Sequence, residues 1–193
     1  MKIPQLKLNK LTLQGILALI VIALFTILGG KDVGRKAEEQ IQEINLPATK
    51  GEFVLVTDVS DGDTITTTID GKEALIRLIG VDTPETKDPR RPVQCFGEQA
   101  SLKTTEWMLN KYVRLAKDSV SGDKDIYDRY LRYVYREDGL FLNKALIEEG
   151  YGFEYTFRGE KYEHQAEFKQ AQKDAEAGKR GLWSPLNCNG KKQ

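Results

Sequence analysis

A run of twenty residues without a single charge, from Leu11 to Gly30, divides the chain into two parts of different kinds. An α-helix of twenty residues is about 30 Å long, which matches the hydrocarbon core of a bilayer. No polar face interrupts the run, so it does not resemble a helix packed on the surface of a globular domain. We therefore expect a transmembrane helix at residues 11–30 and a separate domain after it.

The lysines before this run determine its expected orientation: Lys2, Lys7 and Lys10. Basic flanks stay in the cytoplasm, so residues 1–10 are expected to be cytoplasmic and the rest of the chain extracytoplasmic, in the periplasm or at the cell surface. The alternative is a cleaved signal peptide, which would release the domain. Its apolar stretch is usually about 7–15 residues and ends at small residues, and Ile27 to Gly30 fit that pattern poorly. A retained anchor is favoured, followed by a polar linker at residues 31–50.

From residue 51 onward the pattern is that of a small mixed domain. Phe53, Leu55 and Val59 alternate with polar residues as in a half-buried strand. Four more strands are predicted at residues 64–69, 73–79, 113–117 and 130–135, and helices at residues 97–110, 141–149 and 163–177. Five short strands with helices outside predict an α+β domain, a five-stranded OB-type β-barrel with about three packed helices. We expect it to span residues 51–186, with a polar tail at residues 187–193.

The charge distribution limits how this domain could hold a polyanion. Residues 1–50 carry seven Lys and Arg against four Asp and Glu, whereas residues 51–193 carry 22 against 25. Proteins with a broad basic groove usually show a large positive excess, which this domain lacks at a balance of −3, so any phosphate recognition should be confined to a small pocket. With two cysteines and one histidine, a zinc site of Cys and His ligands is excluded as well.

Three charged clusters stand out, namely Asp61-Gly62-Asp63-Thr64, Arg77 to Glu85, and Asp125 to Arg129. Each has an ordinary structural explanation: a turn, a helix start, or a surface ion pair worth less than about 1 kcal/mol. Together they supply hard carboxylate oxygens that can bind Ca²⁺, a further carboxylate that can activate water, and two guanidinium groups that can clamp a phosphate.

In order and spacing these clusters resemble the motifs of the staphylococcal nuclease-like (thermonuclease) family. The resemblance extends from about Phe53 to Pro185 and includes Val81-Asp82-Thr83-Pro84-Glu85-Thr86, Tyr127-Asp128-Arg129 and Gly181-Leu182-Trp183-Ser184. It implies an OB barrel with three helices and Ca²⁺-dependent hydrolysis of phosphodiester bonds in DNA or RNA.

The resemblance also implies a role for each residue of the motifs. The metal ligands would be Asp63, Asp82 and the backbone carbonyl of Thr83, with Asp61 beside the ion. Glu85 would act on the attacking water, and Arg77 and Arg129 would hold the scissile phosphate. Tyr127 and Tyr155 match positions that line the nucleotide pocket.

Three residues depart from the family pattern: Ile126 replaces a residue that is often basic, Asp128 a usual glycine, and Phe157 a frequent tyrosine. The turn at Asp128 is expected to need a positive φ, which Asp tolerates less well than Gly. An acidic side chain beside Arg129 is expected to change substrate affinity while activity is retained.

Several conspicuous residues carry no motif. Cys95 and Cys188 could form one disulfide in an exported domain, or remain two free thiols. His164 is expected to be a solvated helix residue, Trp107 and Trp183 packing anchors, and the pair Arg90-Arg91 a solvated loop tip or a secondary phosphate contact.

Two other functions are compatible with the sequence. A catalytically weak or inactive OB module could bind single strands or a protein, but it would not need all the carboxylates and both arginines, and it predicts a basic surface. A structural surface protein could use Ca²⁺ to stiffen a loop, but that leaves Arg77 and Arg129 without a role. Nothing in the sequence argues for an oligomer, so a monomer is expected.

Overall fold

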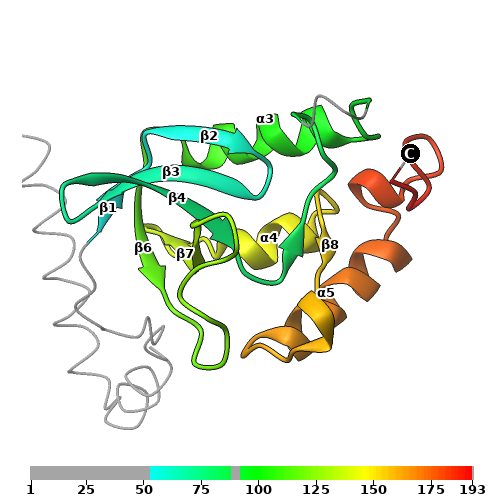
Figure 1. Ribbon diagram of the computed structural model, residues 1–193. Helices are drawn as coiled ribbons and strands as arrows, with labels where there is room; N and C mark the ends of the chain where they lie inside the picture. Colours follow the sequence, from blue (N-terminus) through cyan, green and yellow to red (C-terminus); the bar gives the residue numbers. More distant parts are fainter. Residues whose placement is uncertain (1–52, 88–91, 193) are drawn as a thin grey trace, which may run out of the picture. The chain divides into compact units, whose positions relative to one another are not determined.

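The computed structural model describes residues 53–87 and 92–192 (Figure 1). The expected cytoplasmic segment, the anchor at residues 11–30, the linker and the pair Arg90-Arg91 lie outside the described residues. Among the helices that are described, none is both long and apolar enough to cross a membrane. The chain divides into the units Met1–Ala48 and Thr49–Gln193, and all described residues belong to the second.

Six strands form one mixed sheet in the order β1-β6-β7-β4-β3-β2. The pair β4 and β7 is parallel and every other neighbouring pair is antiparallel. The strands are β1 (Val54–Leu55), β2 (Asp58–Asp61), β3 (Thr64–Ile69), β4 (Lys72–Leu78), β6 (Tyr112–Ala116) and β7 (Tyr130–Arg136).

The two edge strands of this sheet, β1 and β2, are successive parts of one bent strand. Val54 of β1 pairs with Val113 of β6, whereas Asp58 of β2 pairs with Thr66 of β3. Between them, the Thr57 N–H donates to the Thr66 carbonyl at 2.9 Å. The sheet therefore closes on itself as the predicted five-stranded barrel, with the first predicted strand divided in two.

The predicted inward face of this first strand was wrong. It fails for Phe53 and Leu55, which are 47% and 38% exposed, and for the unpredicted Val56, which is buried, whereas Val59 is buried as expected. The strand leaves β6 and joins β3 between these two valines, so the alternation of faces does not continue across the bend. A simple period of two cannot be extrapolated through such a change of partner.

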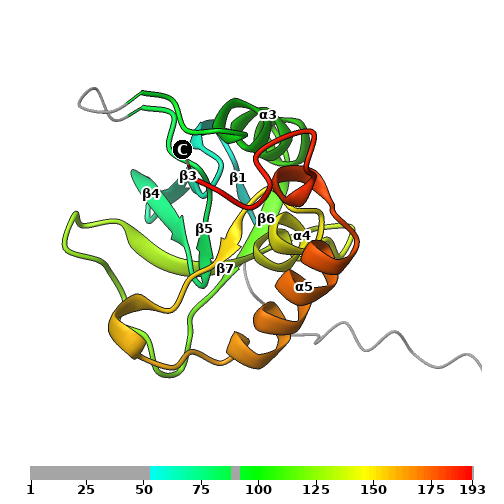
Figure 2. The same ribbon diagram turned by 90° about the vertical axis from the view of Figure 1, so that its right-hand side faces the viewer.

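Three helices pack on the barrel, as predicted: α3 (Gly97–Met108), α4 (Leu142–Glu148) and α5 (Gln165–Ala177). Figures 1 and 2 show α3 lying along β2, and α4 between the barrel and α5. Two short 3₁₀ turns, η1 (Phe157–Gly159) and η2 (Gly181–Trp183), follow later in the chain. A second sheet pairs β5 (Val81–Asp82) with β8 (Phe153–Glu154). It was not predicted, because strands of two residues show no periodicity.

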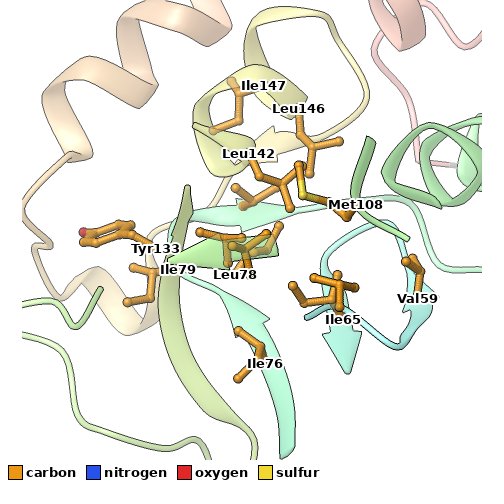
Figure 3. Close-up of a cluster of buried hydrophobic side chains, with 14 of the residues drawn as sticks. Val59, Ile65, Ile76, Leu78, Ile79, Met108, Tyr133, Leu142, Leu146 and Ile147 are labelled. Carbon is orange, nitrogen blue, oxygen red and sulfur yellow. The ribbon is translucent and has the colours of Figure 1, made fainter. Parts of the chain in front are cut away.

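The core fills the barrel and continues between the barrel and α4. Figure 3 shows α4 side chains facing Leu78 of β4, with Met108 of α3 beside them. All of the following are at most 1% exposed: Ile65, Ile76, Leu78, Met108, Leu142, Leu146 and Ile147. Since truncation of such a buried aliphatic side chain costs about 2–5 kcal/mol, this core is a rigid support for the loops that connect the strands.

Candidate active site

The three charged clusters meet in one polar cavity of about 340 Å³. It is lined by Asp61, Asp63, Arg77, Asp82, Thr83, Pro84, Glu85, Gln94, Arg129 and Lys192. The barrel thus brings together residues from the β2–β3 turn, from β4, from the segment after β5 and from the start of β7. Two polar members, Gln94 and Lys192, were not predicted from the sequence.

Asp63 is the most tightly held carboxylate of the cavity, at 6% exposure. Its Oδ2 accepts hydrogen bonds from the Thr83 N–H at 2.9 Å and the Thr83 hydroxyl at 3.2 Å, and lies 3.2 Å from an Arg77 nitrogen. Its Oδ1 accepts from the Thr64 hydroxyl at 3.2 Å. These contacts fix the direction in which Asp63 faces the cavity.

The Asp61-Gly62-Asp63 turn is not an ordinary surface turn, because the segment after β5 and helix α3 both contact it. A Cβ on Gly62 would lie 2.7 Å from the Thr83 hydroxyl oxygen, so only glycine allows this approach. From the other side, the buried Thr104 hydroxyl of α3 donates to the Gly62 carbonyl at 2.7 Å. The turn is therefore positioned by α3 and by the segment after β5.

Asp61 lies beside Asp63 and supports it. Its Oδ1 accepts a hydrogen bond from the Asp63 N–H at 3.1 Å. Burial, followed by the nearby charge of Asp63, raises the pKa of Asp61 to about 7, despite the lowering effect of Arg77. Burial and the neighbouring carboxylate both disfavour the ionised form of Asp61, and a cation bound beside it would relieve both effects.

Arg77 joins the two carboxylates expected to bind metal. One terminal nitrogen donates to the carbonyls of Leu78 at 2.8 Å and Val81 at 2.6 Å. The other lies 3.2 Å from Asp63 Oδ2 and 3.8 Å from Asp82 Oδ1. Arg77 is therefore held at both nitrogens, and the two aspartates approach a common group.

Glu85 is held by its own turn. Its Oε1 accepts hydrogen bonds from the N–H groups of Thr86 at 2.9 Å and Lys87 at 2.7 Å. Gln94 holds the backbone of Glu85 through two hydrogen bonds. Its side-chain oxygen accepts from the Glu85 N–H at 2.8 Å, and its own backbone N–H donates to the Glu85 carbonyl at 2.9 Å. One carboxylate oxygen of Glu85 thus serves the turn, which leaves Oε2 for chemistry in the cavity.

Arg129 is oriented by Asp125. The Asp125 carboxylate accepts hydrogen bonds from the backbone N–H of Arg129 at 3.0 Å and from its Nε at 2.7 Å. Burial acts to raise the pKa of Asp125, but these hydrogen bonds outweigh it and the pKa is lowered. A further nitrogen of Arg129 donates to the Thr64 hydroxyl at 3.3 Å. Thr64 thereby links Arg129 to Asp63.

Asp128 has the left-handed backbone that was expected, with φ 62°. Its carboxylate, however, pairs with Lys124 at 2.8 Å, and it does not line the cavity. This pairing offsets part of the negative charge that was expected to act on Arg129.

The two tyrosines assigned to the nucleotide pocket lie outside the cavity lining. Tyr127 is 73% exposed, with its ring 5.4 Å from the Arg129 guanidinium carbon. Tyr155 is 41% exposed and lies near Phe157, with ring centroids 6.4 Å apart. Both rings remain free to stack on a base, but their assignment to substrate stays a prediction.

The donor set of the cavity fits Ca²⁺, which prefers carboxylate and carbonyl oxygens. Asp63 and Asp82 could bind the ion directly, and Asp61 could add negative charge beside it. In residues 53–87 and 92–192, no three acidic, His or Cys side chains converge closely enough to hold an ion by themselves. An ion here would therefore also need backbone carbonyl or water ligands.

A disulfide joins Cys95 to Cys188, with the Cα atoms 5.8 Å apart. Cys95 directly follows Gln94, which clamps Glu85, and Cys188 lies four residues before Lys192. Gln94 and Lys192, which were not predicted from the sequence, are therefore both close in sequence to this bridge. Their cavity positions depend on long-range folding, and no local motif marks them.

The remaining conspicuous residues contribute to packing. His164 was expected to be solvated, but it lies against Tyr133 and Phe168 with ring centroids 4.7 and 5.8 Å away. Trp107 packs on Tyr151 and Trp183 on Phe153, as expected of anchors. All three side chains lie outside the cavity lining.

Comparison with known proteins identifies the family of this chain. A family model described as staphylococcal nuclease homologue matches residues 75–185. A thermonuclease of Staphylococcus hyicus is 43% identical over 129 residues, which cover 67% of this chain and 74% of the relative. A thermonuclease of Staphylococcus intermedius is 37% identical over 164 residues, covering 85% and 90%. Endonuclease YncB of Bacillus subtilis (strain 168) is 35% identical over 150 residues, covering 74% and 69%. This chain belongs to the staphylococcal nuclease family.

Proposed function

We propose that this protein is a Ca²⁺-dependent nuclease that hydrolyses phosphodiester bonds of DNA, RNA or both. The observation that carries the proposal is the polar cavity in which Asp63, Asp82, Glu85, Arg77 and Arg129 meet. A module that only binds nucleic acid needs basic side chains, but it does not need several carboxylates gathered in one cavity. Membership of a family whose relatives include named thermonucleases and an endonuclease supports the same reaction class.

The arginines would bind and orient the scissile phosphate. Arg129 is preoriented by Asp125, and Arg77 by two backbone carbonyls, so little side-chain entropy is lost when a phosphate binds. As the P–O bond to one sugar breaks, hydrogen bonds donated by Arg129 would stabilise the charge on the leaving oxygen. That oxygen finally takes a proton from solvent.

Glu85 would act on the attacking water. The water oxygen forms the new bond to phosphorus, and the proton that it loses passes to the Glu85 carboxylate. The hydrogen bonds from Thr86 and Lys87 keep this carboxylate in place while it accepts the proton. When bound by Asp63 and Asp82, Ca²⁺ supplies polarisation of a phosphate oxygen and neutralisation of negative charge.

The test is digestion of single- and double-stranded DNA and of RNA by the full chain, purified in mild detergent, with Ca²⁺ or with EGTA. We expect cleavage only with Ca²⁺, and none by a folded Glu85→Ala, Arg129→Ala double variant. A Glu73→Ala variant is the control, since Glu73 is exposed on β4. If the folded wild type bound nucleic acid and Ca²⁺ but cleaved nothing, the proposal would give way to a binding module.

We also propose that residues 11–30 anchor the protein in a membrane, with a monomeric catalytic domain outside the cytoplasm. The uncharged run and the lysines before it support this orientation. Protease treatment of intact cells should remove the domain while residues 1–10 stay protected. Release of the chain from membranes by alkaline carbonate alone would contradict the anchor, and an elution volume corresponding to a dimer would contradict the monomer.

A further inference from the structure

We propose that Lys192 is a further substrate-binding residue of this site, and that the Cys95–Cys188 disulfide holds it in place. The inference rests on the proposed nuclease function and names an additional contact to the phosphodiester substrate. Residues 187–193 were expected to be a polar tail. The structure instead places Lys192 in the lining of the cavity.

The tail that carries Lys192 is folded against the domain. Cys188 is 8% exposed and is bonded to Cys95, just before α3. Backbone hydrogen bonds fix the residues that follow: Asn189 N–H to Ser184 at 3.1 Å, Gly190 N–H to Leu182 at 3.0 Å and Lys191 N–H to Cys188 at 3.1 Å. Figures 1 and 2 show the red C-terminal segment beside the beginning of α3.

Gly190 is the residue that lets the tail turn toward the site. Its φ is 75°, and a Cβ there would lie 2.8 Å from the Trp183 ring. Any other residue would be strained in this backbone conformation and would collide with the indole. The tail can therefore lie on Trp183 only because position 190 has no side chain.

The Lys192 ammonium lies at the wall of the cavity and keeps access to solvent. Its Nζ pairs with Asp82 Oδ2 and lies 4.6 Å from the centroid of the Phe153 ring. The lysine side chain is 34% exposed. An ion pair this exposed to solvent is weak, so the ammonium can turn toward an arriving anion at little cost.

A count of hydrogen-bond donors favours Lys192 as a phosphate ligand. Arg77 and Arg129 already use several of their N–H donors within the protein, in contacts to carbonyls, carboxylates and the Thr64 hydroxyl. Lys192 has three N–H donors, and Asp82 is its one hydrogen-bonding partner among the described residues. Two donors of Lys192 are therefore left for an oxygen of the scissile phosphate or of its neighbour.

The experiment measures binding of a fluorescently labelled single-stranded DNA oligonucleotide to the full chain in EGTA, where no turnover interferes. We expect Lys192→Ala to raise the Kd about fivefold and to reduce the slope of log K against log salt by about 0.7, the value for one lost phosphate contact on a single strand. Lys192→Arg should stay within about twofold of wild type. Lys191→Ala is the matched control, because it removes the same charge from a neighbour outside the cavity lining.

The role of the disulfide is tested by a double-mutant cycle. In a Cys95→Ser, Cys188→Ser background, Lys192→Ala should have no further effect on the Kd, because the tail is then no longer tied to the segment before α3. If Lys192→Ala still cost about fivefold there, the disulfide would not be what positions the lysine, and that part of the inference would be refuted.

Two results would overturn the inference itself. Equal Kd values for Lys192→Ala and Lys191→Ala would show that Lys192 does not contact the substrate. Unchanged DNA binding with tighter Ca²⁺ binding by Lys192→Ala would make Lys192 a competitor for Asp82 instead. Failure of the proposed function would look different, since the folded wild type would then bind DNA but would not cleave it in Ca²⁺, whatever the effect of Lys192→Ala on the Kd.

Discussion

The hydrogen bond from Thr104 to the Gly62 carbonyl gives the sharpest prediction about how the fold positions the site. Thr104 is fully buried on α3, and its hydroxyl donates at 2.7 Å to a residue 42 positions earlier in the chain. Thr104→Val keeps the shape of the side chain and removes only this donor. The Gly62 carbonyl, which lies between Asp61 and Asp63, then loses its bond to α3.

The expected loss of stability is the cost of leaving the buried Gly62 carbonyl without this hydrogen-bond donor. Such a group costs about 1–3 kcal/mol, so we expect the free energy of unfolding to fall by about 2 kcal/mol. For a unit of this size that is a decrease of about 4–8 °C in Tm. Because Asp63 moves with the turn, kcat/KM should also fall, by about tenfold or more.

The assay is thermal and guanidinium unfolding of the full chain together with kcat/KM on DNA. Thr105→Val is the matched control, since the Thr105 hydroxyl donates at 2.8 Å to Ser101 within the same helix and does not reach the turn. The reasoning is refuted if Thr104→Val and Thr105→Val have equal stability and equal activity.

Three further predictions concern stability. Burial acts to raise the pKa of Asp118, but hydrogen bonds from a tyrosine hydroxyl and three backbone N–H groups outweigh it and lower the pKa to about 2. Since this is below the unfolded value, the stabilisation is complete above about pH 4 and is lost toward pH 2. Asp118→Asn should thus cost about 1–2 kcal/mol at pH 7 and little near pH 2 in urea unfolding; an equal cost at both pH values would contradict this. Asp128→Gly removes the strain of a positive φ and loses only an exposed contact to Lys124. The free energy of unfolding should therefore increase by about 0.5–1 kcal/mol and the Tm should rise; a lower Tm would contradict this prediction. Its KM on DNA should also change. Reduction of the Cys95–Cys188 bridge should lower the free energy of unfolding by about 4 kcal/mol in guanidinium titrations with and without dithiothreitol, whereas identical curves would exclude a stabilising bridge.

The architecture was largely predictable because it depends on local patterns. Turn residues such as Asp70-Gly71 mark the hairpin between β3 and β4, and glycines mark the ends of α4 and α5, at Gly150 and Gly178. The bend that separates β1 from β2 was not predictable, because a change of pairing partner leaves no mark in the alternation. The sheet of β5 and β8 was not predictable either, because strands of two residues show no periodicity.

The site was predictable where its residues lie in short motifs, and not where the fold alone brings them in. Asp63, Arg77 and Glu85 belong to recognisable clusters, and the structure places all three in one cavity. Gln94 and Lys192 reach that cavity through a loop and a tail on either side of a disulfide. Their positions depend on contacts between residues 93 positions apart, which no local pattern encodes.

The proposed mechanism depends most directly on the Glu85 carboxylate, which accepts the proton of the attacking water in this cavity. Glu85→Gln keeps the size of the side chain and removes its charge, and Glu73→Gln makes the same change at an exposed position of β4. With saturating DNA and Ca²⁺, we predict that Glu85→Gln lowers kcat by at least about 100-fold while Glu73→Gln leaves it unchanged. Equal kcat values for the two folded variants would contradict the account.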